Sequence, residues 1–303
     1  MIVGGKDIKT TNDATGKFVF NTSGSEVLIE DLTNATQKAF NLDPITNVTI
    51  TSPVFNPLQF NARATLFDVK GATQNLDQIN LELQRRNHDG FPIRLIANNG
   101  NQFTRIDRGV DYGKYPKFIV ISILTFNLYD YKEYMDYHDC MCYISLKYHK
   151  KIFYYLLQIH TLEVLKWDNI HKHPFTKREI KNFTSLDFWM AFFSDKTSYK
   201  ELEIMASQST VMSIAKEKID LFVQDKNNLK AYDQADEVDR IQAGAISFAA
   251  REAAKEAAKE AANDTQVQIA TNMLRDNKSI NEVAKYSELP INKVKELKTK
   301  LSL

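Results

Sequence analysis

The sequence is poor in cysteine, in long apolar runs and in net charge. Cys140 and Cys142 are the only cysteines among 303 residues, too few for a disulfide framework or a four-cysteine zinc site. No apolar run approaches the roughly 20 residues that cross a bilayer, and the N-terminus lacks a basic, apolar leader. We therefore expect a cytoplasmic protein in a reducing compartment, with no membrane partner.

The net charge does not indicate a class of binding partner either, because 39 basic and 38 acidic residues leave a formal net charge of +1. Any contact with nucleic acid must then come from a local basic patch. The chain is 43% hydrophobic, and it is long enough to bury a substantial core. We expect one domain of about 200 residues followed by an appended helical part.

The stretch from Ala64 to Asn87 carries the most informative pattern. Both halves alternate apolar and polar residues around the turn-like segment GATQN, which predicts a β-hairpin. A turn centred near Asn75 fixes the partners across the two strands. The expected pairs are Asp68 with Glu82, Lys70 with Asn80, and Leu66 with Gln84. The apolar face would hold Phe67, Val69, Ile79, Leu81 and Leu83.

The polar face of this hairpin gathers two acidic residues. Side chains directly opposite one another have Cβ atoms roughly 4.5–5.5 Å apart, so Asp68 and Glu82 would repel unless something positive lies between them. A divalent metal ion is the natural occupant. The alternative is an ordinary solvated strand face, which also carries charges.

The order of elements around the hairpin is helix, strand, hairpin, further segment and buried strand. The hairpin and the segment after it resemble the PD-(D/E)XK nuclease family of transposases, also called Rpn or recombination-promoting nucleases. The resemblance is carried by the strings DVK and INLELQ, followed by DRGVDYGKYPKFIVISILTFNLYD. Segments such as DIKTTND, LLQIHTLEVLKW and LDFWMAFF extend the resemblance over most of residues 6–235. It implies an α/β, restriction-endonuclease-like core, a mixed sheet flanked by helices, with a C-terminal all-helical extension.

Three regions follow from this interpretation. Residues 1–183 would form the nuclease-like domain, with a partly ordered first 24 residues, and residues 184–239 a helical subdomain packed on it. Residues 240–303 combine the repeat AAREAAKEAAKEAAN with a small tail that resembles a helix-turn-helix. We expect these C-terminal helices to serve as a spacer or to join two copies of the chain in a homodimer.

The resemblance implies a metal-dependent endonuclease that cleaves double-stranded DNA with Mg²⁺ or Mn²⁺, in DNA mobility, recombination or defence against foreign DNA such as phage DNA. Asp68 and Glu82 would bind the metal ion. Gln84 stands where the general pattern has lysine, so it would orient the attacking water while Lys70 supplies positive charge. The missing lysine also favours an alternative, a DNA-binding or regulatory protein that keeps the fold without turnover.

Other candidate residues flank the hairpin. The resemblance implies that an acidic residue on the first helix supports the metal site, and Glu26 is the expected position, although a carboxylate also simply favours a helix N-terminus. Several arginines also lie near the hairpin. Their guanidinium groups could bind phosphate oxygens, or they could simply lie on a solvent-exposed surface. The arginines expected to contact DNA are Arg85, Arg86, Arg94 and Arg105.

A second metal hypothesis concerns zinc. His138, Cys140, Cys142, His149 and His160 are the residue types that bind it. A C-x-C pair without a second close pair is not a recognised site spacing, so we favour core packing for these residues.

Overall fold

The computed structural model describes residues 1–61, 68–87, 90–100, 111, 114–130, 132–148 and 151–301, without the side chains of residues 98–99 and 151–155. The chain divides into two compact units, Met1–Val238 and Asp239–Leu303. The expected arm and tail, residues 240–303, fall in the second unit. In the part of the chain just defined, no helix is long and apolar enough to cross a membrane.

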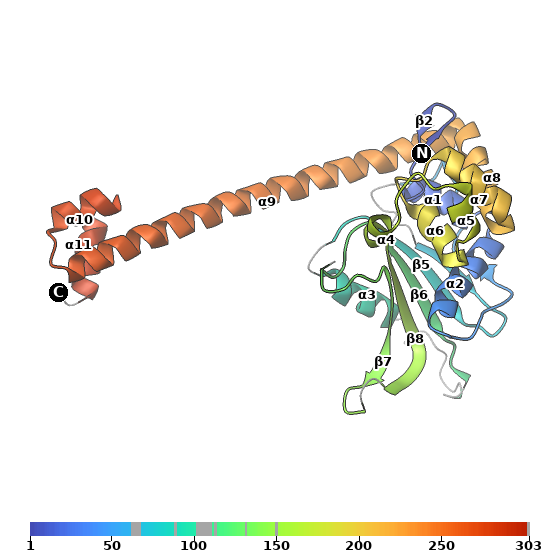
Figure 1. Cartoon of the computed structure of the whole chain (residues 1–303), viewed down its shortest axis with the longest axis horizontal. Coiled ribbons are helices and arrows are strands. Elements are labelled where there is room, and N and C mark those ends of the chain that lie inside the picture. Colours follow the sequence, from blue (N-terminus) through green and yellow to red (C-terminus); the bar gives the residue numbers. More distant parts are fainter. Residues whose placement is uncertain are drawn as a thin grey trace. The chain divides into compact units, whose positions relative to one another are not determined.

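The first unit is built on a mixed sheet of six strands in the order β3-β4-β5-β6-β8-β7, with helices on its faces (Figure 1). Its strands are β3 (Thr49–Ile50), β4 (Asp68–Ala72), β5 (Gln78–Gln84), β6 (Phe118–Leu124), β7 (His138–Ser145) and β8 (Lys151–Glu163). β5, β6 and β8 are parallel to one another, whereas β3–β4, β4–β5 and β7–β8 are antiparallel. The expected α/β core with a mixed sheet is therefore confirmed.

The expected hairpin and its register are also confirmed. Asp68 pairs with Glu82 and Lys70 pairs with Asn80. Burial alternates strictly along β5, because each strand turns one side chain to the core and the next to the polar face. Leu66 and Phe67 lie outside the described residues.

One face of the sheet, the helix-packed face, carries Val69, Ile79, Leu81 and Leu83 and belongs to the main core. It packs against helices from both ends of the first unit, which bury Leu28, Trp189 and Phe222. These helices are α1 (Asp13–Phe20), α2 (Glu26–Ala39), α4 (Val164–Ile170), α5 (Lys177–Lys181), α6 (Ser185–Phe193), α7 (Tyr199–Gln208) and α8 (Thr210–Gln224). Residues 184–238 therefore complete the main core.

The opposite face, here called the carboxylate face, carries Asp68, Lys70, Asn80, Glu82 and Gln84. Part of it is covered by α3 (Phe91–Gly100), whose Phe91 and Leu95 pack on Phe118, Val120 and Leu157. Its last described residues, up to Gly100, include the poor helix formers Asn98 and Asn99. Among the described residues of this face, Asp68 and Glu82 are partly buried.

The first 24 residues differ from expectation, because they are ordered. A small hairpin, β1 (Ile2–Val3) with β2 (Lys6–Asp7), precedes α1. Asn12 caps α1 by accepting a hydrogen bond from Ala14 N at 3.0 Å. Val19 and Phe20 are fully buried, so core packing stabilises a helix whose sequence, with Thr15 and Gly16, has little intrinsic helical preference.

The second unit consists of most of α9 (Lys226–Arg275), α10 (Ile280–Ser287) and α11 (Ile291–Lys300). From Arg240 to Ala262 every α9 side chain is exposed. Alanine and i,i+3 pairs such as Glu252–Lys255, at 2.7 Å, sustain this stretch without tertiary packing.

Candidate functional site

The site is centred on the carboxylates of Asp68 and Glu82, which neighbouring strands bring to directly opposite positions. Burial raises the pKa of Glu82, and the negative charge of Asp68 raises it further. The charges of Arg94 and Lys70 and a hydrogen bond from Asn80 Nδ2 at 3.0 Å act in the opposite direction. The two acids therefore repel each other in a partly desolvated place.

Lys70 stands beside the pair on the same face. Its Nζ lies 3.3 Å from Asp68 Oδ2, and both side chains are 41% exposed. An ion pair this exposed contributes at most about 1 kcal/mol, so an incoming ligand can displace it. The other oxygen, Asp68 Oδ1, is buried without a hydrogen-bond partner among the described residues.

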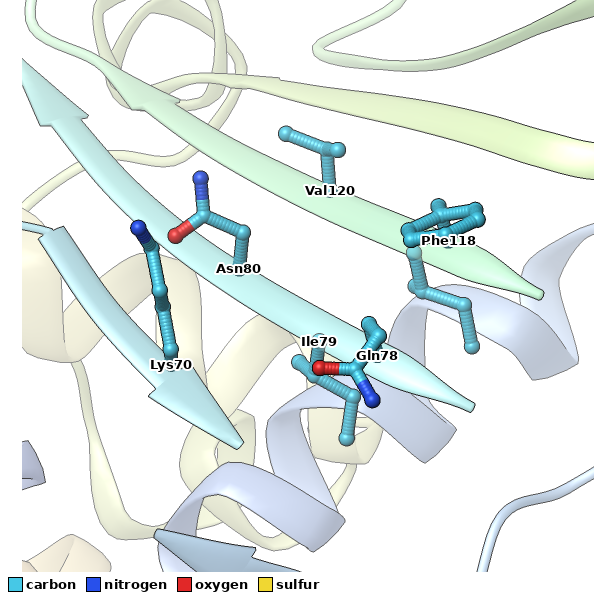
Figure 2. Close-up of a pocket in the computed structure, with 7 residues that line it drawn as sticks. Lys70, Gln78, Ile79, Asn80, Phe118 and Val120 are labelled. Carbon is cyan, nitrogen blue, oxygen red and sulfur yellow. The ribbon is translucent and has the colours of Figure 1, made fainter. Parts of the chain in front are cut away.

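The polar row continues into the next strands. Ser122 of β6 is the register partner of Glu82, and Thr161 of β8 is the partner of Ser122. Both hydroxyl oxygens are buried without a hydrogen-bond partner in the described structure. A shallow pocket adjoins this row, and Figure 2 shows Lys70, Asn80 and Val120 projecting into it from three adjacent strands.

Gln84 lies at the end of β5 with both ends of its amide engaged. Its Nε2 donates to the backbone oxygen of Arg86 at 3.0 Å, and its Oε1 accepts from Arg94 Nη2. An amide has a second N–H and a second lone pair, so Gln84 keeps capacity for one water. In this arrangement it also holds the guanidinium of Arg94 close to Glu82.

Two residues of α1, Asp13 and Lys17, adjoin the site and were not among the sequence candidates. Burial raises the pKa of Asp13 to about 6, although the charges of Arg85 and Lys17 lower it. Burial lowers the pKa of Lys17, and the charges of Asp13 and Asp68 oppose that shift. In the sequence, Asp13 stands out only as the last residue of the segment DIKTTND, because tertiary packing brings α1 against β4.

The remaining candidates come from other parts of the chain. Glu26 begins α2, where its charge acts on Lys218 of α8. Arg85 and Arg86 follow β5 directly, and Arg94 reaches the site from α3. Arg105 lies outside the described residues.

The zinc candidates His138, Cys140 and His160 do meet, on the helix-packed face. His138 Nε2 lies 3.0 Å from His160 Nδ1, and Cys140 Sγ lies 3.7 Å from His160 Nε2. Because His160 directs its two ring nitrogens at different neighbours, these groups form a chain and do not converge on one point. Among the described residues, no three acidic, histidine or cysteine side chains form a metal-binding group. His149 lies outside those residues.

Comparison with known proteins yields one family. A family model described as PD-(D/E)XK nuclease family transposase matches residues 10–249, which includes the whole sheet and both strands that carry the carboxylates. No curated protein and no solved structure matches the chain. Nucleases of this kind generally use divalent metal ions and act on DNA. With its mixed six-stranded sheet, flanking helices and paired carboxylates, the chain belongs to the PD-(D/E)XK nuclease family transposases.

Proposed function

We propose that this protein is a Mg²⁺- or Mn²⁺-dependent endodeoxyribonuclease that hydrolyses phosphodiester bonds in double-stranded DNA. The direct pairing of Asp68 with Glu82 carries the proposal. Two acids held this close, one with a raised pKa, gain most from a bound cation, because it removes their mutual repulsion.

The donor set fits a hard cation. Mg²⁺ prefers oxygen ligands and is usually bound by one or two carboxylates together with waters and substrate phosphates. Asp68 Oδ1, a buried oxygen with no hydrogen-bond partner in the described structure, suits this role. When bound, such an ion would polarise the scissile phosphate and lower the pKa of a coordinated water. Glu26 is a further proposed ligand, and Asp13 is the acid of α1 beside the site.

The neighbouring side chains complete the proposed chemistry. Lys70, on the same face, supplies positive charge to the reacting phosphate. Gln84 positions Arg94 and orients the attacking water through its remaining N–H. Arg85, Arg86, Arg94 and Arg105 hold flanking phosphates, for which the guanidinium group is well shaped.

The biological role that we propose is in DNA mobility, recombination or defence against foreign DNA, including phage DNA, in the cytoplasm. It is supported by the family description, a nuclease family transposase. Cleavage of duplex DNA is the chemical step common to these roles.

Supercoiled plasmid incubated with Mg²⁺ or Mn²⁺ tests the proposal. We expect the wild-type chain to nick or linearise plasmid, and we expect Asp68→Asn and Glu82→Gln each to lower the rate at least about a hundredfold. Asp43→Asn changes an acid with an 87% exposed side chain elsewhere in the first unit and should leave the rate unchanged. Cleavage that survives both site substitutions would eliminate the assignment.

A second function, DNA binding without turnover, is favoured by one observation. Gln84 replaces the lysine of the general pattern, and its amide is already engaged at both ends. Under this alternative, the wild-type chain binds duplex DNA but leaves plasmid intact with either metal ion.

A further inference from the structure

The C-terminal end of the chain is a small folded unit with its own core. α10 and α11 pack against the last turns of α9, and the fully buried side chains of Ala270, Val283 and Val294 lie at the centre. Partly buried side chains close the edges of this core: Val267, Met273, Ile280, Ala284, Leu297 and Leu301. Three helices therefore hold one another without help from the sheet.

A short, well-defined turn joins α10 to α11. Ser279 caps α10 through a reciprocal capping box with Glu282. Glu288 ends the helix in the left-handed region with φ of 58°, Leu289 is buried, and Pro290 immediately precedes α11. Two short helices joined by three residues, one of them left-handed, have the connection of a helix-turn-helix motif.

The outward surface of α11 is basic. Val294 and Leu297 turn inward, whereas Asn292, Lys295 and Thr299 are exposed on the other side. α11 contains four lysines, Lys293, Lys295, Lys298 and Lys300, and a single acid, Glu296. Within the described structure, none of these lysines has a carboxylate within 4.0 Å; Lys293 Nζ instead donates to Asn263 Oδ1 at 2.7 Å. A helix with this excess of unpaired positive charge is complementary to a phosphate backbone.

We infer that α10 and α11 form a second DNA-contacting module, separate from the carboxylate site, in which α11 lies in the major groove of duplex DNA. In helix-turn-helix proteins the second helix enters the groove and its N-terminal residues meet base edges. Asn292 occupies that position, and an asparagine amide can pair with adenine in the major groove. The lysines farther along α11 contact phosphates. This inference concerns binding alone and does not depend on cleavage at Asp68 and Glu82.

The charges on α11 supply the test. In the full chain, Lys295→Glu with Lys298→Glu reverses two of them, and Lys255→Glu with Lys259→Glu makes the same change on the exposed part of α9. Binding to a labelled duplex of about three helical turns is measured with EDTA present, at several salt concentrations. We expect the α11 variant to bind DNA about tenfold or more weakly than the wild type. The plot of the logarithm of the association constant against the logarithm of the salt concentration should become less steep, its slope decreasing in magnitude by about two.

Because EDTA removes divalent ions, this measurement is independent of catalysis, and a failed cleavage assay would leave it intact. Circular dichroism checks that both variants stay folded, and Lys295→Gln with Lys298→Gln gives a milder change of the same surface. Equal losses in the α9 and α11 variants would overturn the inference, and so would unchanged binding by the α11 variant. Altered self-association of the α11 variant with unchanged DNA affinity would also overturn it, because the tail would then be a packing module.

Discussion

At the residue scale, burial and neighbouring charges set the pKa of Glu82, an acid of the proposed metal site. The positive charge of Arg94 lowers the pKa of Glu82, against burial and the charge of Asp68. We predict that Arg94→Ala raises this pKa, so the acid limb of the pH–cleavage profile moves upward by about half a unit to one unit. Arg94→Lys keeps the charge and should move the limb less. An unshifted limb in Arg94→Ala would contradict this electrostatic role.

Asp13 leads to a prediction about stability in the absence of metal. Burial raises its pKa from 3.8 to about 6 in the folded protein, so the unfolded chain ionises first as pH rises. The wild type therefore loses stability between about pH 4 and pH 6, and the loss is complete above that range. The difference in the free energy of unfolding between Asp13→Asn and wild type should increase in favour of the variant by about 1–3 kcal/mol from pH 3.5 to pH 7. Urea unfolding with EDTA measures it. A difference that does not vary with pH would exclude the raised pKa.

The sequence predicts some site residues and not others, for physical reasons. Asp68 and Glu82 are predictable because the period-2 alternation and the turn together specify which residues face each other. Asp13 and Lys17 are not, since their approach to β4 depends on how α1 packs on the sheet, which no local pattern encodes. Glu26, the residue expected on the first helix, instead begins α2, because α1 precedes it in the chain.

At the element scale, the tight packing of β4 explains why a glycine lies in the site hairpin. A Cβ on Gly71 would lie 3.1 Å from Val48 Cγ1 and 3.4 Å from the backbone oxygen of Thr49 on β3. We predict that Gly71→Val lowers the free energy of unfolding by about 1–3 kcal/mol, measured by urea denaturation. Ala72→Val, at the next, partly exposed position, is the matched control and should lower the free energy of unfolding by less. Equal losses of stability in the two variants would show that β3 moves to accommodate the added side chain.

Strands were easier to predict than the short helix α1. The apolar–polar alternation along β5 reflects a strand that is more deeply buried on one face. The continuous apolar run of β6 reflects a strand that is buried on both faces. In contrast, α1 has eight residues, including Gly16 and two β-branched residues, and it is stable only because Val19 and Phe20 enter the core. Local propensity therefore under-predicts elements that depend on tertiary packing.

At the scale of the whole molecule, the exposed part of α9 bears on the number of chains in the assembly. Ile241 and Phe248 are 57% and 67% exposed, and their seven-residue spacing places them on one side of the helix, as in a coiled-coil seam. Burying both against a second α9 would remove them from water. A homodimer formed in this way would carry two copies of α11, and paired helix-turn-helix units bind two half-sites.

We predict that the full chain sediments as a dimer and that Ile241→Ser with Phe248→Ser shifts it to monomer, because each seam loses its two large apolar side chains. Ala253→Ser with Ala257→Ser changes the same exposed helix without removing a large side chain, and this control should remain dimeric. A monomeric wild type in sedimentation velocity, or a dimer that survives the first pair of substitutions, would rule out pairing through this part of α9. If the seam variant is monomeric, its affinity for a two-site duplex should fall, whereas the proposed nicking of plasmid at Asp68 and Glu82 should persist.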